Sequence, residues 1–335
     1  MAIIISKGSG LNDDMWKDTG TVVTSWMMDA DKEQTKDDEQ VKSIFKVETS
    51  NKWAEKSSGV TSMGDFMATA EGENAPLDSI QEGFAKLIEH TAFMKKLVIT
   101  AEMKEDNKVA DMMNQVKGFM HAYKRSRAKF ATAALAGGIT GSFDFGGKTF
   151  DATTGDGLSL FNTAHLGKKA GVATQSNKFS NALGNNADIL YKLANVGMNF
   201  RNDSGEKCGY TFDTIYLPAN CPALIETVAR IIGSDYVVGS NNNDINTQKG
   251  KWKMVVLTYW DAASGTAPYI IGSSEMQKDF APSIFYDRVP LTVRDSINND
   301  NYDLEFVGRA RFSAGFRDWR HLIIGGVAGG TDVTA

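Results

Sequence analysis

Few side chains in this sequence could do chemistry, and they are widely separated. The histidines and cysteines are His90, His121, His165 and His321 with Cys208 and Cys221. A structural zinc site needs about four such ligands close together, and a catalytic one often uses HExxH spacing, which does not occur here. The sequence therefore predicts no metal site and no cofactor.

His165, in the segment Leu160-Phe-Asn-Thr-Ala-His165, is the one histidine that suggests catalysis. A catalytic histidine needs a nucleophile and an orienting carboxylate around it. Neither a GxSxG nucleophile elbow nor a GxxxxGK[ST] phosphate loop is present. We interpret His165 as a structural histidine, hydrogen-bonded beside a hairpin. No catalytic residue is predicted, and a soluble hydrolase remains the alternative from another class.

Cys208 and Cys221 are expected to be free thiols. An extended segment, Tyr210–Leu217, lies between them and would span ~26 Å at ~3.3 Å per residue. A disulfide needs Cα atoms within about 7 Å, and nothing in the pattern requires the chain to return. Two unpaired thiols are typical of a protein made in a reducing cytoplasm.

Charge and hydropathy exclude two further classes. A formal net charge of −5 argues against a dedicated nucleic-acid binder, although an acidic surface can line a container that touches nucleic acid weakly. No segment approaches the ~18 consecutive apolar residues of a membrane span. The N-terminal run Ala2–Ile5 is too short for a signal peptide.

The strongest structural pattern is a long amphipathic helix over Lys108–Ala136. Apolar residues recur there at the i, i+3, i+4, i+7 spacing of one helical face. Asp106 or Asn107 is expected to cap its start and Gly137-Gly138 to end it. About 30 residues give a length of ~45 Å. Its basic residues are interpreted as a solvated face: Lys117, Lys124, Arg125, Arg127 and Lys129.

Two segments before this helix have no purpose in a monomer. Residues 1–40 lack a sustained period and predict an irregular arm that lies on something else, or a flexible tail. Strands at Val41–Val47 and Phe84–Thr100, joined by the polar excursion Ser50–Asp78, predict a long projecting hairpin. So long an excursion is unusual inside a compact domain and suggests a partner outside it.

The remainder alternates helices and strands, so the predicted class is α+β. The pattern predicts a hairpin at Phe143–Phe150 with a Gly-Gly turn. It also predicts two helices, Asn186–Asn199 and Pro222–Ile232. The further strands are predicted at Tyr210–Leu217, Trp252–Trp260, Pro268–Ile271, Asn301–Phe312 and Trp319–Val327.

Three stretches resemble the major head subunit of tailed bacteriophages, with the Hong Kong 97-like capsid fold. Residues 82–106 resemble the returning strand of that family's E-loop running into its spine helix. Residues 156–165 are similar to a stretch of Mu-type head subunits, and residues 307–325 look like the family's closing strands. The likeness spans about residues 41–327, and the order of elements also matches.

The resemblance implies a role for each part of the chain. Residues 1–40 would be an N-terminal arm and 41–100 the E-loop hairpin. Residues 101–207, with the spine helix at 107–136, would form the peripheral domain and 208–285 the axial domain. Residues 286–335 would supply the return strands of the peripheral domain and the C-terminus.

The implied function is that of a major capsid protein, a virion shell subunit made in the host bacterial cytoplasm. Its partners would be copies of itself in pentamers and hexamers, a portal protein, and packaged double-stranded DNA contacted non-specifically, with no membrane. Only about 40 residues precede the hairpin, so scaffolding would come from a separate protein, unless an upstream piece is absent. An encapsulin-like nanocompartment shell is the alternative within the fold, and encapsulins usually begin with a short helix.

Candidate subunit-contact residues lie in the arm and in the hairpin. They are Trp16, Trp26, Lys52, Trp53 and Lys56. Some family members cross-link a hairpin lysine to an asparagine of a neighbour, but lysines are common in such segments. We therefore do not expect Lys52 or Lys56 to cross-link.

Overall fold

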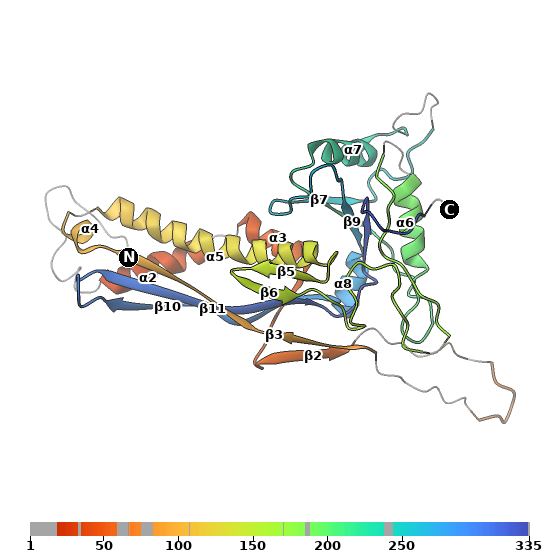
Figure 1. Cartoon of the computed structure of the whole chain (residues 1–335), viewed down its shortest axis with the longest axis horizontal. Coiled ribbons are helices and arrows are strands. Elements are labelled where there is room, and N and C mark those ends of the chain that lie inside the picture. The colour runs from red at the N-terminus through yellow and green to blue at the C-terminus, as the bar shows by residue number, and fades with distance from the viewer. Residues whose placement is uncertain are drawn as a thin grey trace.

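The structure is a computed structural model in which an elongated body carries a second layer of helices and strands at one end (Figure 1). It describes residues 19–32, 35–58, 66, 68–74, 83–106, 108–169, 171–184, 188–237 and 244–333. Trp16 lies outside these residues. Helices and strands are mixed within both parts, which confirms the predicted α+β class.

The body is a long helix lying along a four-stranded sheet. The helix is α5 (Val109–Gly137), and the strand order is β1-β10-β11-β4. The strands are β1 (Lys46–Thr49), β10 (Ser283–Ile297), β11 (Leu304–Phe316) and β4 (Thr91–Ile99). Met112 and Val116 of α5 are fully buried in one cluster with Ile99 and Phe306 of the sheet. The helical periodicity therefore identified the buried face correctly.

The ends of α5 differ in how well they were predicted. Asp106 closes the short helix α4 (Ala101–Glu105), and Lys108 precedes α5 without a side-chain cap bond, so the prediction of a cap at Asp106 is wrong. Asn107 lies outside the described residues. At the other end, the Gly138 N–H donates to the Ala134 carbonyl, and α5 ends there as predicted.

The N-terminal segment is helical from residue 19, which corrects the prediction of an irregular arm. Helices α2 (Thr19–Lys32) and α3 (Lys36–Ile44) both pack on α5. The acidic first turn of α3 and Lys42 in its last turn suit the helix dipole. The strand predicted at Val41–Val47 is wrong over its first half, because α3 continues to Ile44 and β1 starts at Lys46.

Charged side chains hold these helices against α5. Lys124 is 4% exposed; its Nζ donates to the Asp31 carbonyl at 2.9 Å and lies 3.5 Å from Asp38. Arg127 donates to Asp287 at 2.6 Å. The prediction of a solvated basic face is therefore wrong for Lys124 and Arg127, since α2 and α3 cover them.

The second part is built on another four-stranded sheet, in the order β12-β9-β7-β8. Its strands are β12 (Leu322–Gly325), β9 (Tyr269–Gly272), β7 (Thr214–Pro218) and β8 (Lys253–Leu257). Its helices are α6 (Asp188–Met198), α7 (Pro222–Gly233) and α8 (Ser274–Phe280). Every residue of β7, β9 and β12 is buried, as expected for strands covered on both faces.

A small hairpin beside α5 follows the sequence prediction. Strands β5 (Ser142–Phe145) and β6 (Lys148–Asp151) are joined by Gly146 and Gly147. Both glycines have positive φ, 60° and 78°, which a two-residue type I′ turn requires.

The long strands at the end of the chain were predicted poorly. Strand β10 was not predicted, because Pro290 interrupts its alternation. The ladder to β11 shifts register between Asp287 and Val289 and again between Val289 and Thr292, and a bulge there tolerates the missing N–H of Pro290. Strand β11 begins at Leu304 rather than at Asn301. Trp319–Val327 is not one long strand, because only Leu322–Gly325 pairs, and it pairs with β9.

Candidate subunit-contact site

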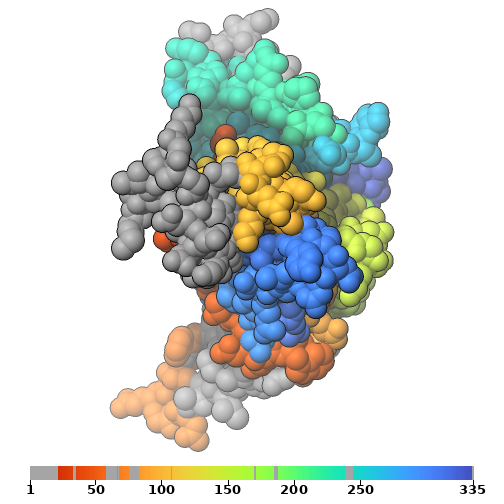
Figure 2. All heavy atoms as spheres, turned by 90° about the vertical axis from the view of Figure 1, so that its left-hand side faces the viewer, coloured from red at the N-terminus to blue at the C-terminus, as the bar shows by residue number. Residues whose placement is uncertain are grey.

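A two-stranded hairpin leaves the body below β11 (Figure 1). Strands β2 (Ala54–Ser58) and β3 (Ala85–Glu89) pair antiparallel, and His90 separates β3 from β4. Figure 2 views the molecule along its long axis, and the described part of the connecting segment, residues 68–74, stands clear of the other described residues. We call residues 54–89 the projecting hairpin.

The outward side of the projecting hairpin exposes apolar area. Leu87 is 50% exposed on β3, opposite the exposed Lys56 on β2. Trp53, just before β2, is 68% exposed. Lys52 forms an exposed ion pair with Glu55 at 3.2 Å.

The predicted contact residues are therefore only partly brought together. Lys52, Trp53 and Lys56 lie at or near the start of the projecting hairpin. Trp26 instead packs partly buried against the cluster between α2, α5 and the sheet.

The inward side of β3 is held by buried polar contacts that the sequence analysis missed. Lys86, with 10% of its side chain exposed, donates to Asp151 Oδ2 at 2.5 Å and to Thr153 Oγ1 at 2.6 Å. Burial raises the pKa of Asp151, but the hydrogen bonds from Lys86 and Thr153 outweigh it, so this pKa lies below its ordinary value. The pair fixes the projecting hairpin to strand β6.

His90 joins the two chain segments where they leave the sheet. Its Nε2 lies 3.1 Å from Ser50 Oγ and its Nδ1 2.8 Å from Ser313 Oγ. Ser50 donates its only hydroxyl proton to Glu55 at 2.8 Å, so it must accept from Nε2–H. A neutral His90 with its proton on Nε2 therefore satisfies the network.

The surroundings of His90 oppose a positive charge on its ring. Burial lowers the pKa of His90, and Arg311 and Arg288 lower it further, while Glu55 acts in the opposite direction. The Arg311 guanidinium also donates to the His90 carbonyl at 3.3 Å. The ring thus stays neutral at neutral pH.

The alternation of residues along β3 could have identified its inward face from the sequence. In a strand, residues i, i+2 and i+4 point to the same side. Ile88 is buried at 5%, and Lys86 and His90 on the same side are each 8% exposed. An apolar residue between a lysine and a histidine marks that face as inward.

Arg320 forms a second anchor near the base of the projecting hairpin. Its guanidinium donates to Asp318 Oδ2 at 2.6 Å, to Asp203 Oδ1 at 2.8 Å and to the Arg201 carbonyl at 2.6 Å. Asp203 also accepts from the Phe84 N–H at 3.4 Å. Burial raises the pKa of Asp203, although Arg320 opposes this. The network joins the segment just before β3, the 201–203 loop and the segment just before β12.

His165 has the structural role that was predicted. The ring is fully buried, stacks on Trp319 at 4.3 Å and has its Nδ1 2.6 Å from Asp156 Oδ2. Thr154 donates to the other oxygen of Asp156 at 2.5 Å. The buried pair holds the loop around Asp156.

The described part of the chain shows neither a disulfide nor a cluster of metal ligands. Both Cys208 and Cys221 are free thiols, and burial raises the pKa of Cys208 to about 11. No group of three or more His, Cys, Asp or Glu residues is placed to hold a metal ion within the described part of the chain. Across those same residues, no helix is long and apolar enough to span a membrane.

Comparison by sequence and by structure gives different results. No protein-family model and no curated protein matches the sequence. By structure, the chain is similar to the capsid of a native GTA particle, with 10% identity, a TM-score of 0.51 and coverage of 89% of this chain and 92% of that chain. It is also similar to a chain of Mycobacterium phage Patience, with 11% identity, a TM-score of 0.51 and coverage of 99% and 96%. The chain therefore has the Hong Kong 97-like fold of tailed-phage capsid subunits.

Proposed function

We propose that this chain is the major capsid protein of a tailed phage or prophage, a structural subunit without enzymatic activity. Copies would assemble as pentamers and hexamers into an icosahedral shell around double-stranded DNA. The observation that supports this most directly is the projecting hairpin: its inward face is satisfied within the chain, while Trp53 and Leu87 remain exposed on a capsid-type fold.

In this proposal the parts of the chain have separate tasks. Residues 1–40 contact neighbouring copies, and the hairpin region 41–100 overlaps an adjacent copy. Residues 101–207 form the peripheral domain around α5, and residues 208–285 form the axial domain at the five-fold and six-fold centres. Residues 286–335 return to the peripheral domain and end the chain.

The proposed partners follow from the same assembly. A separate scaffolding protein guides the shell, a portal protein occupies one vertex, and the packaged DNA is touched without sequence preference. The net charge of −5 suits weak contact with DNA rather than tight binding. The protein would be made in the host cytoplasm and end in the virion capsid.

The energetics favour many weak contacts over one strong contact. A tryptophan offers about 200 Å² of surface, and Trp53 exposes 68% of it. Covering that area at ~25 cal/mol per Å² contributes at most ~3 kcal/mol per contact. Such a contact alone is reversible, but a copy that touches several neighbours makes each added contact effectively intramolecular.

The encapsulin-like alternative is distinguished by the shell's contents. An irregular N-terminal arm was expected to distinguish this chain from encapsulins, which usually begin with a short helix. This criterion does not apply, because α2 and α3 are helices. The capsid reading is supported by the likeness to phage and GTA capsids. Purified shells from cells should contain DNA or an internal scaffold rather than a cargo enzyme.

The experiment is electron microscopy and light scattering of the purified protein, with co-expressed scaffold where needed. Closed shells are expected from the whole chain. A matched variant replaces residues 59–82 with Asn-Gly, which leaves β2, β3 and the contacts of Lys86 and His90 in place. This variant should remain a folded subunit and fail to form shells. A whole chain that stays monomeric under every condition would contradict the proposal.

A further inference from the structure

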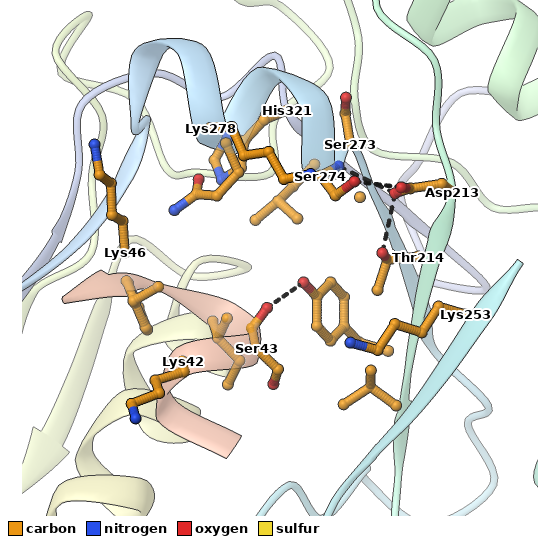
Figure 3. Close-up of a pocket in the computed structure, with 17 residues that line it drawn as sticks. Lys42, Ser43, Lys46, Asp213, Thr214, Lys253, Ser273, Ser274, Lys278 and His321 are labelled. Atoms are coloured by element: carbon orange, nitrogen blue, oxygen red, sulfur yellow. Dashed lines mark hydrogen bonds between the residues drawn. The ribbon is translucent and has the colours of Figure 1, made fainter. Parts of the chain in front are cut away.

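A cavity of about 520 Å³ lies where α3, β7, β8 and α8 meet. Four exposed lysines from different elements line it: Lys42, Lys46, Lys253 and Lys278. Figure 3 shows Lys42, Lys46 and Lys278 on one side of Ser43 and Lys253 on the other. The Tyr216 hydroxyl donates to the Ser43 carbonyl at 2.6 Å and thereby holds α3 against β7.

The positive charge of this cavity is largely uncompensated. Of these four lysines, only Lys46 forms an ion pair with another described residue, Glu48, at 3.3 Å. The one carboxylate lining the cavity, Asp213, accepts from the Ser274 N–H and from the Thr214 hydroxyl, each at 3.0 Å, and from the Ser274 hydroxyl. These bonds fix α8 to β7, and no ion pair joins Asp213 to a lysine within the described residues.

The same chain contains a segment of opposite charge. Residues 59–84 hold five carboxylates and no lysine, arginine or histidine. Within it, residues 70–73 form a turn with Gly72 at φ 85°, where the Ala70 N–H donates to Glu73. Glu71 and Glu73 are exposed there. In Figure 1 this turn points away from α3 and α8, so a chain does not offer it to its own cavity.

We propose that the lysine-lined cavity receives the acidic turn around Glu71 and Glu73 from a second copy of this chain. The inference rests on the proposed function, because it requires adjacent copies. A concave site ringed by lysines from four elements fits a narrow acidic turn better than it fits the broad surface of duplex DNA. The contact joins the most projecting described segment of one copy to the junction between the two sheets of the next.

The main test is a charge swap in assembly. Lys42→Glu with Lys278→Glu, and separately Glu71→Lys with Glu73→Lys, should each lower the yield of shells at least tenfold. The four changes combined should recover most of the yield. Lys192→Glu, on the exposed side of α6, is the matched control and should assemble normally. Near-normal assembly of both charge-reversed proteins, or no recovery in the combined protein, overturns the inference.

A binding test separates this inference from the proposed function. A fluorescent peptide with the sequence of residues 66–82 is titrated into the intact wild-type subunit and into the Lys42→Glu, Lys278→Glu variant. Binding should weaken at least tenfold in the variant and with added salt. If the wild-type chain forms no shells but shows this difference, the proposed function fails and the acceptor cavity stands. If the variant keeps the peptide and instead loses duplex DNA, the cavity is a DNA contact and the inference is wrong.

Discussion

Replacing Arg320 by methionine is the most informative single change to the folded subunit. Arg320 is 2% exposed, and the Asp203 and Asp318 side chains are each 3% exposed. Its guanidinium also lies 4.7 Å from the Trp319 ring. Methionine retains most of the volume of the stem but removes the positive charge and all three kinds of hydrogen bond.

The expected loss of unfolding free energy comes from the two buried carboxylates that remain when Arg320 is replaced. These carboxylates lose the cation that pairs with both of them, and removing one partner of a buried ion pair typically costs about 3–5 kcal/mol. Burial already raises the pKa of Asp203, and without Arg320, which opposes this, the pKa of Asp203 should lie further above the unfolded value of about 3.9. Stability from a raised pKa is present below the unfolded value and is lost as pH rises through the folded value. The difference between wild type and variant should therefore be larger at pH 7.5 than at pH 5.

Urea denaturation of the unassembled subunit, followed by tryptophan fluorescence, measures this difference. The matched control adds Asp203→Asn and Asp318→Asn to Arg320→Met, which removes the two negative charges that Arg320 pairs with and should recover part of the loss. A loss below about 1 kcal/mol, or an equal loss at both pH values, would show that the network does not support the fold as argued.

Three further outcomes are expected. Val116→Asp places an unpaired charge at a site with no exposure and should lower the unfolding free energy by about 3–5 kcal/mol. The control, Lys117→Asp at an exposed position, should change this free energy by less than about 0.5 kcal/mol. Equal losses would mean that the helical phase is wrong. The pKa of His90 is lower in the folded state than its ordinary value of 6.5, so its contribution to stability is present above pH 6.5 and is lost as pH falls. His90→Gln should therefore lose less stability than wild type between pH 7.5 and 5.5 in urea titrations. Parallel curves for the two proteins would refute this prediction. Cys221→Ser, chelator and reductant should each leave the melting temperature unchanged, and a drop with any of them would reveal a structural metal site or disulfide.

The sequence predicted correctly those elements whose partners lie close in the sequence, and those whose apolar pattern repeats over many residues. Helix α5 repeats its apolar spacing over eight turns, and α7 begins with Pro222 at its first turn, as predicted. The turn of two glycines between β5 and β6 was also predicted. In these cases the backbone preference and the burial pattern indicate the same structure.

The N-terminal helices could not be predicted in the same way, because their partner is distant. Val23 and Met27 are buried at 1% and 3%, at helical spacing, but the apolar residues around them form two short runs, Val22-Val23 and Trp26–Met28, without a sustained period. The charges of α3 suggested a solvated tail until Lys124, more than 80 residues away, was found beneath it. A charged segment can be a buried helix when the surface that receives it carries the opposite charge.

The candidate contact site shows the same limit. Exposed residues such as Trp53 could be proposed from their type, but the anchors beneath them depend on tertiary pairing. His90 meets Ser313, which is 223 positions away, and Lys86 meets Asp151, which is 65 away. No local pattern encodes such a pair, although the alternation around Ile88 marks the face on which the anchors lie.

The two faces of β3 have different tasks in the proposed contact between copies, and together they can make a weak contact specific. Lys86 and His90 on the inward face each make two hydrogen bonds within the chain, so these bonds set the direction of the projecting hairpin without a neighbour. A preset direction reduces the conformational entropy that association must remove. Leu87 on the outward face then needs to contribute only a modest apolar contact. In the proposed shell, loosening the inward anchors should therefore weaken assembly, because these anchors set the direction of the projecting hairpin from within one chain.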